Sequence, residues 1–86
     1  MASIWQRKII DKYESMGYYV IKLITTNKAG IPDLLCLKKG ELPTFIECKE
    51  KNDTLKVLQK FRLDELRSAG CIAKVMQDGK DNLELI

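Results

Sequence analysis

Residues 30–49 read GIPDLLCLKKGELPTFIECK, and this stretch decides the fold. Two mainly apolar runs, at 33–37 and 44–49, are separated by a polar segment that begins KKGE. This pattern predicts two strands joined by a turn. The connection is too short for a crossover helix, so the strands should pair antiparallel as a hairpin. Pro32 cannot donate to a sheet ladder, and the first of these strands should therefore begin at about Asp33.

An amphipathic helix is predicted before the hairpin, from Ser3 to about Met16. Apolar residues recur there at intervals of three or four, with charged residues between them. Gly17 follows the last apolar position and should end the helix. Tyr18 to Ile24 is rich in aromatic and β-branched residues and is predicted to be a strand, followed by a polar loop at 25–30.

A second helix and a final strand are predicted after the hairpin. Asp53 or Thr54 is a good N-cap for a helix that runs to about Ala69. Residues 71–76 are predicted to form a strand, and residues 77–86 to begin with a polar turn and return as a short edge segment. The helix is expected to pack through one mainly apolar side, which carries Leu55, Leu58, Phe61, Arg62, Leu66 and Ala69.

The predicted order is αβββαβ, which indicates an α/β fold with a mixed central sheet. The chain of 86 residues fits one domain, residues 1–86. Its composition, 45% hydrophobic and 31% charged, is typical of a soluble globular protein, and its apolar runs are too short to span a bilayer. No secretory signal is visible, and three cysteines indicate a reducing, intracellular compartment rather than a disulfide framework.

Three charged residues of the hairpin carry the predicted chemistry. Glu47 and Lys49 are two apart in a strand and therefore project from the same face, whereas Cys48 points away. The hairpin brings Asp33 to the same end of the sheet. The chain contains no histidine, which excludes Ser-His, Cys-His and His-metal chemistry. Catalysis would have to use carboxylates, lysines or hydroxyls.

Two carboxylates beside an amine suit Mg²⁺, a hard cation that takes oxygen ligands, water and substrate phosphate oxygens; Mn²⁺ is expected to substitute. Asp33 and Glu47 would be the ligands, and Lys49 could orient a water and offset charge on a phosphate. The formal net charge of +3 is too small to indicate a nucleic-acid partner by itself. If a metal ion neutralised two of the acidic residues, the excess of positive charge would be larger and would favour a polyanionic partner more clearly.

The motif Gly30-Ile31-Pro32-Asp33, the run Ile46-Glu47-Cys48-Lys49 and the later Gln59 together resemble the pattern of VRR-NUC domains. These domains belong to the PD-(D/E)xK nuclease superfamily and are related to Holliday junction resolvases. The resemblance covers essentially the whole chain and implies a restriction-endonuclease-like fold. It also implies a metal-dependent endonuclease that cleaves branched DNA, such as four-way junctions, as a homodimer.

The resemblance also implies roles for individual residues. Related nucleases often carry a glutamate on the first helix, and the alignment puts Gln6 at or near that position, where its amide could accept from a metal-bound water but adds no charge. The roles carried over are metal ligands at Asp33, Glu47 and the main-chain carbonyl of Cys48, a catalytic lysine at Lys49 and a further site residue at Gln59.

Other interpretations of the same residues were open. Taken singly, Asp33 is an ordinary turn residue, and Glu47 with Lys49 an exposed strand pair. Lys28 and Lys51 flank the predicted site and are expected to bind DNA, although scattered lysines usually form a solvated surface. Two other functions fit the fold: a DNA-binding module without catalytic activity, and an interaction subunit of a larger complex. A homodimer should bury some of the large aromatic residues Trp5, Tyr18, Tyr19 and Phe61, which could instead complete the core.

Overall fold

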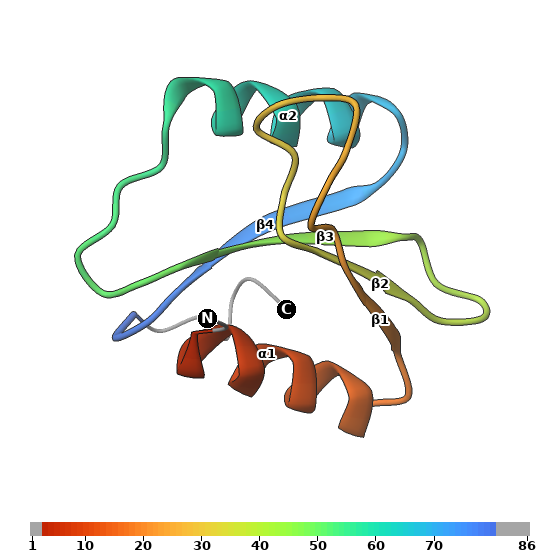
Figure 1. The fold of residues 1–86 in the computed structure, drawn as a ribbon. Coiled ribbons are helices and arrows are strands. Elements are labelled where there is room, and N and C mark those ends of the chain that lie inside the picture. Colours follow the sequence, from red (N-terminus) through yellow and green to blue (C-terminus); the bar gives the residue numbers. More distant parts are fainter. Residues whose placement is uncertain (1–2, 81–86) are drawn as a thin grey trace.

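A four-stranded mixed sheet separates two helices that cover its opposite faces (Figure 1). The computed structural model describes residues 3–80. The strand order is β1-β2-β3-β4, with β1–β2 and β2–β3 antiparallel and β3–β4 parallel. The elements are α1 (Ile4–Ser15), β1 (Tyr19–Lys22), β2 (Leu34–Leu37), β3 (Thr44–Lys49), α2 (Val57–Ser68) and β4 (Ile72–Gln77). The predicted αβββαβ order and the mixed sheet are confirmed.

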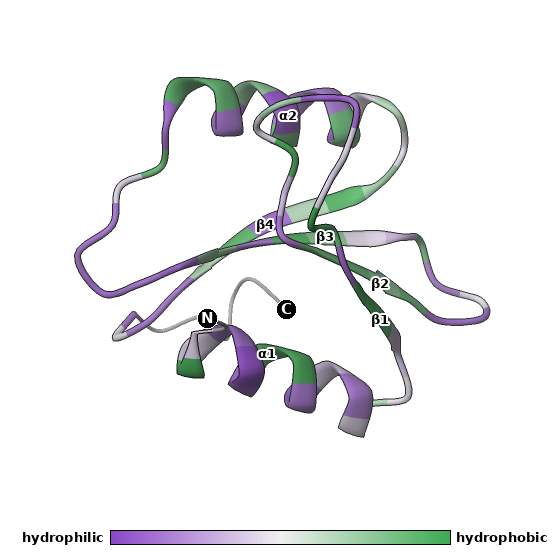
Figure 2. Cartoon of the chain, viewed as in Figure 1, coloured by the Kyte–Doolittle hydropathy of each residue, from purple (hydrophilic) through white to green (hydrophobic). Residues whose placement is uncertain are grey.

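The hairpin predicted from residues 30–49 forms as β2 and β3. Leu34 lies opposite Ile46, and Cys36 lies opposite Thr44. The return to the parallel neighbour β4 uses α2 as the crossover, which is the usual way of joining parallel strands. Figure 2 shows that the paired strands are largely hydrophobic, whereas the loop between β3 and α2 is mainly hydrophilic.

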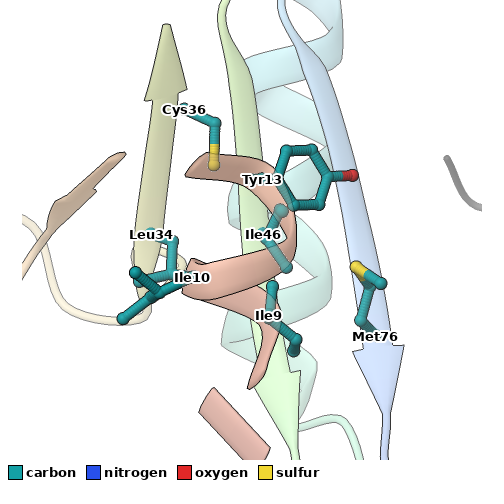
Figure 3. Close-up of a cluster of buried hydrophobic side chains, with 7 residues drawn as sticks. All are labelled: Ile9, Ile10, Tyr13, Leu34, Cys36, Ile46 and Met76. Atoms are coloured by element: carbon teal, nitrogen blue, oxygen red, sulfur yellow. The ribbon is translucent and has the colours of Figure 1, made fainter. Parts of the chain in front are cut away.

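The main core lies between α1 and the sheet. Ser3 caps α1, because its hydroxyl accepts a hydrogen bond from the Gln6 N–H at 2.8 Å. The helix then directs its apolar stripe at alternate residues of the strands. Burying each large aliphatic side chain of this kind stabilises the fold by roughly 1.5–3 kcal/mol. The cluster consists of Ile9, Ile10, Tyr13, Leu34, Cys36, Ile46 and Met76 (Figure 3).

The start of α2 differs from the prediction. The helix begins at Val57 with Lys56 at the N-cap, not after Asp53 or Thr54. Asp53 is used locally instead: its Oδ2 accepts from the Glu50 N–H at 3.1 Å, and its own N–H donates to the Glu50 carbonyl at 3.1 Å. These two bonds close a turn directly after β3. Because Asp53 is committed to that turn, it cannot cap the helix.

The side of α2 that packs inward also differs from the prediction. Leu63 is 1% exposed, whereas Leu58 and Phe61 are 42% and 53% exposed. The side chains of α2 that are buried or half-buried are those of Gln59, Arg62, Leu63 and Leu66. Of the expected stripe, Arg62 and Leu66 face inward, whereas its other four members are exposed, because the inward side of the helix is centred on Leu63.

Three further predictions can be compared with the described part of the chain. The edge segment expected at the end of residues 77–86 falls largely on 81–86, outside the described residues. Cys36, Cys48 and Cys71 are free thiols, and Cys36 is buried in the core. Within residues 3–80, no helix is long and apolar enough to span a membrane.

Candidate functional site

The alternation of β3 divides its side chains between the two faces of the sheet. Ile46 packs into the core beneath α1. Glu47 and Lys49 project from the opposite face, toward α2, and are only 4% and 7% exposed. A buried carboxylate and a buried ammonium each carry a large desolvation cost unless they have partners. The surrounding side chains show what those partners are.

Asp33 links the start of β2 to the end of β3. Its Oδ2 accepts a hydrogen bond from the Cys48 N–H at 2.7 Å. The carboxylate thus occupies the place that a backbone carbonyl would take if the ladder continued. This contact fixes the Asp33 side chain at the end of the sheet that holds Glu47, as the hairpin pattern predicted.

Gln59 extends from the first turn of α2 to Glu47. The Gln59 Nε2 donates to Glu47 Oε2 at 3.3 Å, and Lys49 Nζ lies 3.6 Å from the same oxygen. The Gln59 Oε1 accepts from the Lys56 N–H at 3.0 Å. Because the amide oxygen must face that backbone donor, the amide nitrogen must face Glu47. The structure therefore brings together four of the predicted site residues: Asp33, Glu47, Lys49 and Gln59.

The surroundings of Glu47 in this cluster raise the pKa of its carboxyl group. Burial, and after it the nearby charge of Asp33, raise its pKa, while Lys49 opposes both effects; the net result is a pKa of about 7 instead of 4.5. Two carboxylates that repel each other in a buried position are an arrangement that a cation would relieve.

The raised pKa of Glu47 predicts how the metal-free protein responds to pH. Because the folded pKa lies above the ordinary value, the folded state binds the proton more tightly between pH 4.5 and about 7. The free energy of unfolding should therefore fall, by roughly 1–3 kcal/mol, as pH rises through that window. Urea denaturation in chelator at pH 5 and pH 7.5 measures this change.

The Glu47→Gln variant is the matched control for this pH effect. The glutamine side chain has the size of glutamate but cannot titrate. The decrease in unfolding free energy between pH 5 and pH 7.5 should therefore be smaller in this variant, by roughly the 1–3 kcal/mol assigned to Glu47. An identical pH dependence in the parent and in Glu47→Gln would contradict the assignment to this residue.

The main-chain carbonyl of Cys48 is available as a ligand because of Pro32. In a strand, the N–H and C=O of one residue point toward the same neighbouring strand. Since the Cys48 N–H points to Asp33, the Cys48 carbonyl points to the same side. Extending the Leu34–Ile46 register by two residues places Pro32 opposite Cys48, and proline has no N–H to donate.

The donor set fits a hard cation on chemical grounds. Asp33 Oδ1 and Glu47 Oε1 take no part in the hydrogen bonds and ion pair described above, and the two carboxyl groups are close enough to share a proton. With the Cys48 carbonyl they form an all-oxygen set suited to Mg²⁺ or Mn²⁺, completed by water and phosphate. Among residues 3–80, no group of three or more acidic or cysteine side chains could hold a metal ion.

Three other predicted site residues lie outside this cluster. Gln6 is on α1, the helix that covers the opposite face of the sheet from Glu47, and its role as a water-mediated metal ligand stays a prediction (Figure 1). Lys28 is exposed in the β1–β2 loop, and Lys51 is exposed in the turn after β3. Their role in DNA binding also stays a prediction.

Comparison with known proteins agrees with this geometry. A family model described as "VRR-NUC domain" matches residues 3–78. The chain belongs to the VRR-NUC domain family. This family is part of the restriction-endonuclease-like nuclease superfamily, so the protein has a nuclease fold. The match spans every residue of the candidate site, from Gln6 to Gln59.

Solved structures support the assignment to the VRR-NUC family. One, named "VRR_NUC domain", is 27% identical with a TM-score of 0.70 and covers 81% of this chain and 76% of its own. Another, named "VRR_NUC domain protein", is 29% identical with a TM-score of 0.52. The match covers 80% of this chain but only about half (52%) of the other protein's chain. No curated protein matches the chain.

Proposed function

We propose that this VRR-NUC domain is a divalent-metal-dependent endonuclease that hydrolyses phosphodiester bonds in branched DNA, such as four-way junctions. The observation that carries the proposal is the convergence of Asp33, Glu47 and Lys49 at one end of the sheet, with Glu47 and Lys49 buried. A bound Mg²⁺ or Mn²⁺ would polarise a phosphate and lower the pKa of a water.

The protein side chains have distinct roles in this proposal. Asp33, Glu47 and the Cys48 carbonyl would hold the cation. Lys49 presents a compact positive charge where negative charge develops on the phosphate, and its burial strengthens that interaction. The amide of Gln59, fixed at both ends, keeps the Glu47 carboxylate in one orientation.

DNA would approach over exposed basic side chains. Lys28 lies in the loop that precedes Asp33, and Lys51 lies in the turn that follows Lys49. Each lysine would contact a phosphate. The free thiols of the described chain support an intracellular location.

A cleavage assay tests the proposed activity. We expect the protein to cut branched DNA in Mg²⁺ or Mn²⁺ and to be inactive in excess chelator, with linear duplexes of the same sequence cut more slowly. DNA binding that weakens with salt, without cleavage in either metal, would support a catalytically inactive DNA-binding module instead. No binding to any DNA would favour an interaction subunit.

We also propose that the working species is a homodimer formed through the outer face of α2. Val57 is 88% exposed and Phe61 is 53% exposed, one turn apart on that face. Lys60 lies on this face toward the start of the helix and Asp64 toward its end. An antiparallel two-fold contact in which the two Phe61 rings meet would bring each Lys60 within reach of the Asp64 of the other copy, which also pairs with Arg67 of its own helix at 3.0 Å. Gln59 points inward, so this contact would leave the site open.

Sedimentation equilibrium tests the dimer. We expect a mass of twice 9.9 kDa for the parent at micromolar concentration and 9.9 kDa for Phe61→Lys, because the variant places two like charges at the centre of the contact. Leu42→Lys is the matched control, since Leu42 is 58% exposed on the β2–β3 turn, and it should remain dimeric. A parent that sediments as a monomer while cleaving four-way junctions would exclude the dimer.

A further inference from the structure

The side-chain amide of Gln77, at the end of β4, contacts three carbonyl groups of one loop. Its Nε2 lies 3.1 Å from the Glu50 oxygen, 3.3 Å from the Lys51 oxygen and 2.7 Å from the Asp53 oxygen. An amide nitrogen carries only two hydrogens, so at least one of them is shared between two carbonyls. The side chain thus joins β4 to almost the whole turn that follows β3.

Gln77 is placed for this role by the parallel register. It pairs with Lys49, and partners in a parallel pair project from the same face of the sheet. The Lys49 carbonyl also accepts from the Asp78 N–H at 2.9 Å. The chain on either side of Gln77 is therefore tied to the end of β3, at the position of the buried lysine.

The loop held by Gln77 connects two elements of the site. It starts after Lys49 and leads to Lys56, whose N–H holds the Gln59 amide. It also carries Lys51, whose aliphatic stem lies against the turn after β4: a Cβ on Gly79 would meet the Lys51 Cγ at 3.5 Å. Any shift of residues 50–53 would move Lys51 and the start of α2 together.

We propose that Gln77 is a positioning residue of the nuclease site. Its amide fixes the path of residues 50–53, which holds Lys51 in place for DNA and keeps the start of α2 where Gln59 reaches Glu47. The part of this inference that concerns DNA rests on the proposed function. The part that concerns the loop does not, and can be measured without DNA.

Two substitutions separate the amide's donor role from its size. Gln77→Leu removes the donors at similar volume, and Gln77→Glu places a carboxylate against three carbonyl oxygens, which should repel it. Ile72→Gln is the control, because Ile72 is 40% exposed at the other end of β4 and touches none of this loop's carbonyls. Circular dichroism and thermal melts establish that each variant is folded.

Hydrogen exchange is the first measurement. The Glu50 and Asp53 amides, which are bonded within the turn, should exchange about tenfold faster in Gln77→Leu and faster again in Gln77→Glu, whereas Ile72→Gln should match the parent. Parental exchange at residues 50–53 in both folded Gln77 variants would overturn the proposal.

Cleavage kinetics are the second measurement. Because a displaced Lys51 weakens DNA binding, we expect KM to rise about three- to tenfold in Gln77→Leu, with kcat falling by less. Faster loop exchange with unchanged kcat and KM would overturn the role in the site. A parent that cleaves no DNA would overturn the proposed function alone, because the exchange result still decides what Gln77 does to the loop.

Discussion

Glu47→Gln and Asp33→Asn are expected to abolish DNA cleavage while leaving the fold intact. Each keeps the size of its side chain but removes a negative charge from the oxygen set that would hold the metal. Lys49→Ala should be equally inactive, because it removes the buried cation beside Glu47. The loss should be on the order of 10²- to 10⁴-fold in rate for each variant.

Metal affinity should separate these variants. Calorimetry should show weaker Mg²⁺ or Mn²⁺ binding for Asp33→Asn and Glu47→Gln, and equal or tighter binding for Lys49→Ala, since a competing positive charge is gone. Lys49→Ala should still fold, because the raised pKa of Glu47 lets its carboxyl group take up a proton once the lysine is gone. Lys39→Ala, on the exposed β2–β3 turn, is the control. Cleavage at the parental rate by any folded site variant would reject the mechanism.

Gly30→Ala is expected to destabilise the protein by roughly 2–5 kcal/mol, the largest effect on stability among the changes considered. Gly30 has a φ of +81°, which disfavours any residue with a Cβ. A Cβ there would also lie 2.8 Å from the Leu58 Cγ and 3.3 Å from the Leu58 carbonyl carbon. The glycine thus lets the loop before Asp33 lie against α2.

Gly40→Ala provides a control that separates the two causes. Gly40 has a similar φ of +85°, but a Cβ there meets nothing within 4 Å. It should cost only about 1–2 kcal/mol, from backbone strain alone. Urea denaturation of the two variants measures the difference. Equal losses of stability would show that the contact with Leu58 contributes nothing.

The hairpin and its acidic residues were predictable from the sequence because the information there is local. A period of two assigns Glu47 and Lys49 to one face whatever packs on that face. Pro32 limits the hydrogen-bond ladder of the sheet because its backbone nitrogen carries no hydrogen. These two facts place the carboxylates and the lysine at one end of the sheet before any tertiary contact is known.

The position of α2 could not be predicted in the same way. Asp53 has the chemistry of an N-cap, but whether it caps a helix or closes a turn with Glu50 depends on where the chain goes next. The inward position of Gln59 depends on Glu47, which lies on another element. Gln77 was overlooked for the same reason, because its partners are carbonyl groups, which any residue can provide.

The parallel pairing of β3 with β4 makes the site depend on the strand pairing that is most distant in sequence within the described sheet. Thr44 of β3 pairs with Ile72 of β4, and all of α2 lies between them in the sequence. By contrast, β1, β2 and β3 pair with strands that are adjacent in the sequence. Among the strands, α2 packs mainly on β4. When this pairing opens, helix and strand should therefore move together. Such an opening removes Gln59 from Glu47 while Asp33, Glu47 and Lys49 stay on the hairpin. The domain would then be inactive although its antiparallel strands remain paired.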